Sequence, residues 1–226
     1  MTFFCTLRQR SVLVPLLWAS SMALVAPVYA ASVVLTQGGA SLERGDKTLL
    51  VAAGMQVREG DVLHTGGDGE MFVRFDNGAR MLVRAESTVN FVTLKEKGET
   101  TKRRKTIQLI QGGLRYVTGK GAARHRVAFK TDTSTIGIRG TDLEIAVASE
   151  SKPDAPSGTY LQVNRGAAVL EALDGTLVNV ERGELAFGGE PELTPKGIGA
   201  IKQPAGRKLQ AVLHVFKKSG LDALLR

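Results

Sequence analysis

The sequence predicts an all-β protein with a short C-terminal helix. Glycine accounts for 26 of the 226 residues, above the average of about 7%, and the glycines separate short runs in which apolar and polar residues alternate. This arrangement is typical of many short strands joined by tight turns. No helical pattern occurs between Ser32 and Phe187, whereas apolar residues recur at helical spacing after residue 206.

The first segment, residues 1–30, has the order of a secretory signal peptide. Two arginines give it a positive start, an apolar stretch runs from Val12 to Val25, and a small residue closes it at Ala30. The apolar stretch is shorter than the roughly 20 residues that a membrane span needs, and an uncleaved anchor is the alternative. We therefore expect a periplasmic or secreted protein. Cys5 is the only cysteine, so the exported chain is expected to lack disulfides and thiolate ligands.

Residues 31–189 are predicted to form one β domain that contains two similar hairpins. Asn77-Gly78 lies between two alternating runs in MFVRFDNGARMLV, and Asp174-Gly175 does so in AVLEALDGTLVNV. Both dipeptides tolerate the positive φ that two-residue hairpin turns demand. The second strand of each hairpin leads to a phenylalanine, Phe91 or Phe187, which indicates two related β units.

The stretch TDTSTIGIRGTDLEI predicts a β-bulge. Its apolar residues occupy even positions before Gly140 and odd positions after it, whereas a regular strand keeps one parity on one face. Glycine suits the extra residue that such a switch requires. We predict that Gly140 re-aims the strand and that Thr141 hydrogen-bonds across the bend. Arg139 is expected to point outward or to pair with Asp132 or Asp142, and a ligand contact through these three residues is the alternative.

Four motifs occur in an order that resembles the FecR domain family. The opening G-D-x-L-x-T-G motif is followed by the Asn77-Gly78 hairpin, a strand with two glycines, the RGT strand of residues 139–141 and a final strand pair. The residues of the opening motif are Gly60, Asp61, Thr65 and Gly66. The resemblance covers about residues 45 to 189 and implies an all-β domain, a twisted sandwich or β-solenoid-like fold, outside the cytoplasmic membrane.

The best-known members of that family relay iron-uptake signals from an outer-membrane receptor to a sigma factor, through a cytoplasmic anti-sigma region that precedes a membrane span. Only about ten residues precede the apolar stretch in this sequence. We therefore expect a stand-alone member and do not carry sigma regulation over. The resemblance then implies a role in protein interaction outside the cytoplasm.

The C-terminal part differs in composition from the β domain. Residues 190–206 are rich in Gly and Pro and are predicted to be a linker, and residues 207–226 are predicted to form an amphipathic helix. Leu209, Leu213 and Phe216 lie on one side of that helix. Such a stripe is expected to pack on the β domain or on a partner, and peripheral contact with a membrane surface is the alternative.

The formal net charge of +8 comes largely from two regions, residues 95–105 and the C-terminal tail. A basic patch can attract nucleic acid, anionic lipid or acidic glycan, and nucleic acid is the least expected of these for an exported protein. The candidate interaction residues in the first region are Lys102, Arg103, Arg104 and Lys105.

The sequence contains no credible catalytic or metal-binding set. His64, His125 and His214 are scattered, without metal-ligand spacing. Asp142 and Glu144 share one strand face and are interpreted as outward acids on an edge strand. We expect a non-enzymatic module of the bacterial envelope that has no cofactor or metal and binds a protein partner. The alternative is a module that binds anionic glycan or membrane surface through the basic segments.

Overall fold

The computed structural model describes residues 31–95, 104–119, 126–153, 155–209 and 219–225. The predicted signal peptide, Lys102 and Arg103, and the helical positions Leu213 and Phe216 lie outside these ranges. The described strands are β1 (Ala31–Gln37), β2 (Ala40–Arg44), β3 (Lys47–Leu50), β4 (Gln56–Val57), β5 (Val62–Thr65), β6 (Glu70–Phe75), β7 (Arg80–Val83), β8 (Thr88–Lys95), β9 (Arg104–Val117), β10 (Arg126–Lys130), β11 (Ser134–Ala148), β12 (Gly158–Ala172), β13 (Leu177–Glu181), β14 (Leu185–Gly188) and β15 (Ala200–Lys202).

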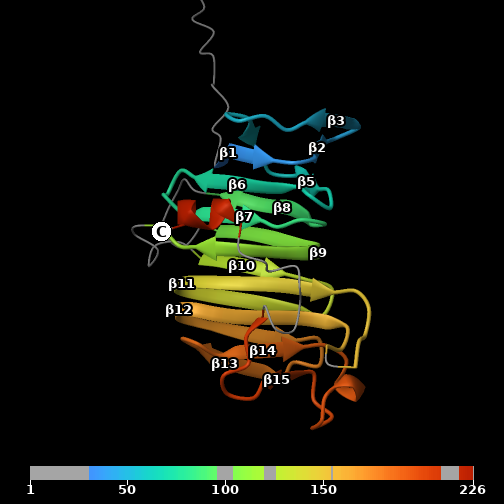
Figure 1. Cartoon of the computed structure of the whole chain (residues 1–226). Coiled ribbons are helices and arrows are strands. Elements are labelled where there is room, and N and C mark those ends of the chain that lie inside the picture. The colour runs from blue at the N-terminus through green and yellow to red at the C-terminus, as the bar shows by residue number, and fades with distance from the viewer. Residues whose placement is uncertain (1–30, 96–103, 120–125, 154, 210–218, 226) are drawn as a thin grey trace, which may run out of the picture.

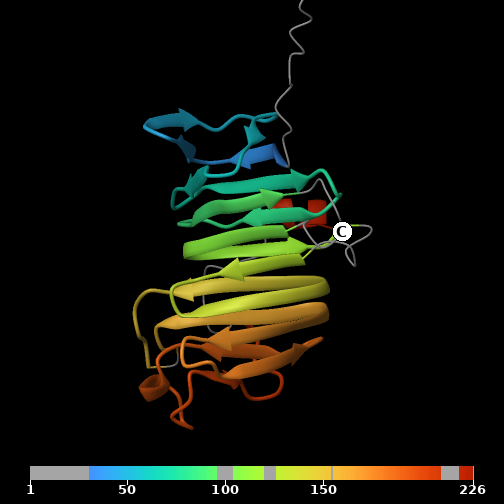
Figure 2. The same ribbon diagram turned by 180° about the vertical axis from the view of Figure 1, so that it is seen from behind.

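These strands belong to one continuous sheet, which confirms the all-β prediction. They are stacked along one axis, from β1–β3 at one end to β13–β15 at the other (Figures 1 and 2). The pairings divide the sheet into two opposed faces. Face 1 contains β1, β4, β6, β7, β14 and β15, and face 2 contains β2, β3, β5, β8, β10 and β13. The architecture is therefore solenoid-like, with the layers closed by strands that pass from one face to the other.

Three long strands connect the faces, because each bends in its middle. The first part of β9 pairs with β8 and its last part with β7, β11 pairs first with β10 and then with β9, and β12 pairs first with β14 and then with β13. The bends lie at Gly112 in β9, Gly140 in β11 and Gly166 in β12, all with positive φ. A strand that bends in this way must change which side it buries, which explains the parity switch in the sequence of β11.

Gly140 and Gly166 lie against each other at one bend. Their φ angles are +62° and +82°, and the register of β11 on β12 shifts between Arg139 and Asp142. The Thr141 hydroxyl donates to the carbonyl of Ala167 at 2.9 Å and accepts from the N–H of Arg139 at 3.2 Å. The bulge thus satisfies polar groups that a regular ladder would pair, and Arg139 is exposed beside it.

The prediction of two-residue hairpin turns is wrong, because both hairpins have three-residue loops. The N–H of Gly78 donates to the carbonyl of Phe75 at 2.9 Å, and the N–H of Gly175 donates to that of Ala172 at 3.0 Å. Of each Asx-Gly pair only the glycine has positive φ. The Asn77 side chain accepts from the N–H of Ala79, and Asp174 accepts from that of Thr176. These side-chain bonds favour a turn followed by a left-handed glycine.

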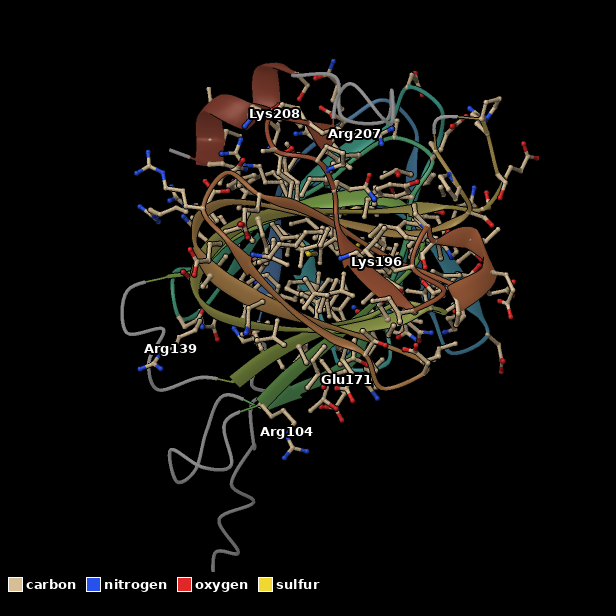
Figure 3. The ribbon with its side chains drawn as sticks, turned by 90° about the horizontal axis from the view of Figure 1, so that it is seen from below. Arg104, Arg139, Glu171, Lys196, Arg207 and Lys208 are labelled. Carbon is tan, nitrogen blue, oxygen red and sulfur yellow. The ribbon has the colours of Figure 1, made fainter. Side chains whose placement is uncertain are left out.

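The core lies between the two faces, as the view along the stack shows (Figure 3). Phe75 of β6 contacts Tyr116 of β9 with ring centroids 5.8 Å apart, and Tyr116 contacts Phe129 of β10 at 5.1 Å. Lys105 is fully buried in this core, and its Nζ lies 4.4 Å from the centroid of the Phe75 ring. Its prediction as a surface interaction residue is wrong. Lys105 shares the strand parity of the buried Ile107, so the pleat of β9 turns it inward.

Residues 190–206 are not a linker, since they fold onto the end of the stack. They contain the 3-10 helix η3 (Pro191–Leu193) and β15, which pairs with β14. The Thr194 hydroxyl donates to the carbonyl of Ile198 at 2.7 Å, and the N–H of Gly199 donates to the Asp174 carboxylate at 2.7 Å. Side-chain and backbone acceptors therefore order a segment whose composition indicates a linker.

The described parts of the C-terminal tail also pack on the domain, although the predicted helix over 207–226 remains a prediction for its middle part. Leu209 is fully buried beside Tyr160 and Phe187. The last described element is the 3-10 helix η5 (Gly220–Leu225), which lies beside β7 (Figure 1).

Candidate functional site

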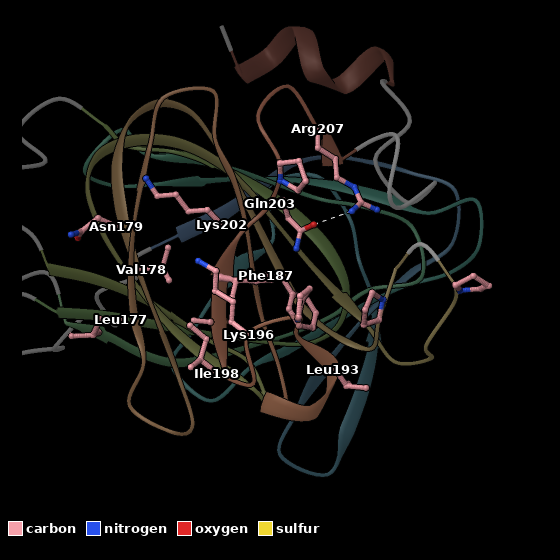
Figure 4. A pocket seen from close by; sticks show the side chains of 16 residues that line it. Leu177, Val178, Asn179, Phe187, Leu193, Lys196, Ile198, Lys202, Gln203 and Arg207 are labelled. Atoms are coloured by element: carbon pink, nitrogen blue, oxygen red, sulfur yellow. Dashed lines mark hydrogen bonds between the residues drawn. The ribbon is translucent and has the colours of Figure 1, made fainter.

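A groove of about 940 Å³ lies at the β13–β15 end of the stack (Figure 4). We call it the end groove. Leu177 and Val178 of β13, Phe187 of β14 and the β15 segment line it, together with loop prolines. The prolines are Pro153, Pro156, Pro195 and Pro204.

Two edge strands border the end groove. Among the described strands, β13 pairs only with β12, and β15 pairs only with β14. An edge strand presents N–H and C=O groups that a further chain can pair with, and flanking prolines are one way in which proteins limit such pairing. The end groove therefore combines backbone groups for hydrogen bonding with apolar side chains, and Pro204 follows β15 by two residues.

The charged side chains at the end groove are cationic. Lys196, Lys202 and Arg207 line it, and none of the described lining residues is a carboxylate. Lys196 lies near the centre of this end of the molecule (Figure 3). Lys202 pairs with Glu184 just outside the groove at 2.7 Å, and this hydrogen bond lowers the pKa of Glu184. Because both partners are substantially exposed, the pair contributes little and can be exchanged for another carboxylate.

A second polar cluster lies on the outer side of face 1, far from the end groove in the strand order. The Arg84 side chain is only 1% exposed, and its two terminal nitrogens each lie 2.8 Å from an oxygen of Asp222 in η5. Arg115 donates to both oxygens of Asp142, at 3.0 and 2.9 Å, and to Asp222 at 3.2 Å. Bidentate pairs of this kind are the strong form of charge-assisted hydrogen bond.

These contacts shift the pKa values of the groups involved. Burial opposes the charged form of Asp222, but the hydrogen bonds from Arg84 and Ser219 and the charges of Arg84 and Arg115 together outweigh it, so the pKa of Asp222 is lowered. The hydrogen bond with Asp142 raises the pKa of Arg115. Both arginines and Asp222 are therefore charged at neutral pH.

Glu144 differs from its neighbours, and its interpretation as an outward acid on an edge strand is wrong. Strand β11 lies between β9 and β12, inside the sheet, and the Glu144 side chain is 3% exposed. It lies 3.7 Å from Arg115 and accepts from Asn164 at 3.4 Å. Burial raises the pKa of Glu144 despite these partners. The local alternation carries no signal for this burial, because β9 and β12, which flank β11 at Glu144, come from other parts of the chain.

The opening motif of the FecR pattern has a structural place in the molecule. Asp61 is buried and accepts from the Arg44 side chain at 2.8 and 2.7 Å and from the N–H of Arg58 at 2.7 Å. The Thr65 hydroxyl donates to the carbonyl of Arg84 and accepts from the N–H of Ser87. The Asp61 bonds tie β2 to the turn before β5, and the Thr65 bonds tie β5 to the connection between β7 and β8.

The two glycines of that motif also make backbone contacts within the domain. The N–H of Gly60 donates to the carbonyl of Phe91 at 2.8 Å, and that of Gly66 donates to Gly39 at 2.9 Å. None of the opening-motif residues lines the end groove. Their arrangement points to a role in holding the strands together.

The described residues contain neither a cluster of metal ligands nor a membrane-spanning helix. Within them no group of three or more His, Cys, Asp or Glu side chains is placed to hold a metal ion. No helix in the described part of the chain is long and apolar enough to cross a membrane.

The sequence matches the family described as FecR protein over residues 61–186. The chain belongs to the FecR protein family. The matched region begins in the opening motif and ends in β14, so it contains both hairpins and the Gly140 bulge. The resemblance seen in the motifs is confirmed.

Two crystal structures of a candidate anti-sigma factor from Parabacteroides distasonis are similar to this chain. Their sequence identities are 8% and 10%, and their TM-scores are 0.49 and 0.47. The similarity covers 64% and 63% of this chain and only 59% and 58% of those chains. No curated protein matches the sequence.

Proposed function

We propose that this chain is a non-enzymatic interaction module of the bacterial cell envelope, exported by residues 1–30, and that it binds an extended segment of a partner protein in the end groove. Membership of the FecR family supports a signalling-related role. The observation that carries the proposal is the end groove itself, where two edge strands, apolar side chains and three cations meet.

The chemistry of the end groove defines the partner segment. Apolar side chains of the segment would contact Leu177, which is 63% exposed, and the partly exposed Ile198. Carboxylates of the segment would meet Lys196 and could replace Glu184 beside Lys202. An extended chain fits best, because pockets for alternate side chains beside a sheet edge are the usual basis of strand-like peptide recognition.

A glycan is a weaker candidate for the same groove. The only aromatic side chain among its described lining residues is Phe187, which is buried. No exposed ring in this part of the molecule therefore offers a flat apolar surface to a sugar. The basic segment proposed for glycan binding also contributes less than its composition indicates, because Lys105 is in the core.

The test compares two matched substitutions at opposite ends of the stack. Leu177→Arg blocks the end groove, whereas Leu50→Arg changes an 86% exposed residue of β3 at the other end. Purified chains that begin at Ala31 are used to capture partners from an envelope extract, and candidate segments are then measured as synthetic peptides. We expect Leu177→Arg to weaken peptide binding about tenfold, about 1.4 kcal/mol, and Leu50→Arg to leave it unchanged.

Equal effects of the two substitutions would refute the end groove as the binding site. Binding of acidic glycan or anionic vesicles that Leu177→Arg abolishes would replace the protein partner with the alternative ligand. A peptide that binds the parent chain equally well at low and at high salt would exclude the role proposed for Lys196 and Lys202.

A further inference from the structure

The outer side of face 1 carries a patch that the chain covers with its own C-terminal segment. The segment is residues 219–225, and it contains η5. Its Leu221 and Leu225 are buried in one cluster with side chains from three strands. We call these side chains, together with the two arginines beside them, the outer patch: Phe72, Leu82, Arg84, Arg115 and Val117.

The C-terminal segment is held in the manner of a bound peptide. It contributes no strand to the sheet. It contacts the outer patch through two leucine side chains, the bidentate pair of Asp222 with Arg84 and a hydrogen bond from Arg115 to Asp222. Ser219 helps to orient the Asp222 carboxylate, since the backbone N–H of Ser219 donates to it at 2.9 Å. The resulting pattern is Leu-Asp-x-x-Leu in a single short helix, with all three side chains directed at one surface.

The outer patch can exist without the C-terminal segment, because each arginine has another carboxylate. Arg84 lies 3.3 Å from Glu70, and Arg115 keeps both of its hydrogen bonds to Asp142. Departure of Asp222 therefore leaves neither guanidinium without an anionic partner, which would otherwise be the large cost of opening a buried pair. What remains uncovered is the apolar side of Phe72, Leu82 and Val117, and an exposed apolar patch is typical of an interaction site.

We propose that the outer patch is a second docking site, for a short helical segment of a partner protein that carries the pattern Leu-Asp-x-x-Leu, and that residues 219–225 occupy this site as an intramolecular competitor. The carboxylate is recognised by the fork of Arg84, and the two leucines cover Phe72, Leu82 and Val117. This site is independent of the end groove and does not rest on the function proposed for it.

A partner is a better occupant than a second copy of this chain. A tethered segment acts at an effective concentration of about millimolar. The identical segment of another copy therefore cannot compete at micromolar protein concentration. A partner segment with additional contacts can displace residues 219–225. The apparent affinity of that partner segment is its intrinsic affinity multiplied by the fraction of molecules in which residues 219–225 have left the outer patch.

The experiment weakens the C-terminal segment without altering the outer patch. The probe is a labelled peptide with the sequence of residues 219–226, SGLDALLR, and the protein is the chain from Ala31 to Arg226. In the test variant Leu221→Ser and Leu225→Ser remove the two buried leucines. The matched control is Leu224→Ser in the same segment, where the side chain is 40% exposed.

We expect the test variant to bind the peptide at least about tenfold more tightly than the parent chain, because the competitor is weakened, and the control to bind like the parent. A peptide with Asn in place of Asp222 should bind at least about tenfold more weakly, since the bidentate pair is lost. Arg84→Gln in the test variant should weaken binding of the unchanged peptide by a similar factor, since the same bidentate pair is lost.

Several outcomes would overturn the proposal. One is a test variant that is folded by circular dichroism and binds the peptide no better than the parent chain. Asp222→Asn provides a second way to weaken the segment, and failure of both variants to fold would make residues 219–225 part of the fold. Dimers of the parent chain at micromolar concentration that disappear in the test variant would assign the outer patch to a second copy instead.

Discussion

Replacing each of the two glycines at the β11–β12 bend should separate two contributions to the free energy of unfolding. One is backbone strain at positive φ, and the other is collision of the added Cβ with neighbouring backbone. Gly140 and Gly166 both have positive φ, but their surroundings differ. A Cβ at Gly140 would meet nothing within 4 Å, whereas a Cβ at Gly166 would lie 2.4 Å from the carbonyl oxygen of Gly140. Alanine at the first position therefore carries only the backbone penalty, and alanine at the second adds a collision with another backbone.

The expected magnitudes follow from these two terms. The left-handed conformation costs an L-residue roughly 1–2 kcal/mol, which is the whole expected effect of Gly140→Ala. Gly166→Ala adds the cost of moving packed backbone, roughly 1–3 kcal/mol. Gly140→Asn should cost least, because asparagine adopts positive φ more readily than other non-glycine residues.

Urea unfolding of the three variants and the parent chain, followed by circular dichroism, gives the free energies. Thermal midpoints provide a second measure, with about 2–4 °C expected for each kcal/mol in a chain of this size. Equal destabilisation by Gly140→Ala and Gly166→Ala would refute the reasoning, since it would mean that the space beside each glycine does not matter. A neutral Gly166→Ala would exclude the close approach of the two strands.

Three further predictions concern buried charge and export. The raised pKa of Glu144 means that folding favours its protonated form, so its contribution to stability is present at low pH and is lost as pH rises from 4.5 through the raised pKa. Relative to the parent chain, Glu144→Gln should therefore become more stable between pH 4.5 and pH 8, as measured by urea unfolding, and a pH-independent difference would contradict this. Lys105→Ala should destabilise the domain by roughly 2–4 kcal/mol through loss of core packing. The control is Arg104→Ala at the exposed neighbouring residue, which should change the free energy of unfolding by less than about 0.5 kcal/mol. Similar effects of the two substitutions would place Lys105 at the surface. The intact mass of the exported protein should correspond to a chain that starts at Ala31, and recovery of the full-length chain from the inner membrane would support the anchor instead.

The local pattern of the sequence determined the class of fold and several of its turns. Alternating residues between glycines predicted strands, and Asn77-Gly78 and Asp174-Gly175 predicted hairpins, because turn chemistry acts over a few residues. The parity switch at Gly140 predicted the bulge for the same reason. The burial of Lys105 could also be predicted, since Lys105 shares one side of β9 with the apolar Ile107 and Leu109.

The tertiary structure alone decided where the two candidate binding surfaces lie. The end groove is assembled from loops and strands between Pro153 and Arg207, and composition indicated only a linker for part of that range. Arg84 and Asp222 are separated by 138 positions in the chain, and Asp222 belonged to a segment whose pattern indicated only an amphipathic helix. Local periodicity determines which side of a helix or strand is apolar. The surface against which that side packs depends on strand register and on contacts between distant segments, and short-range patterns do not encode these.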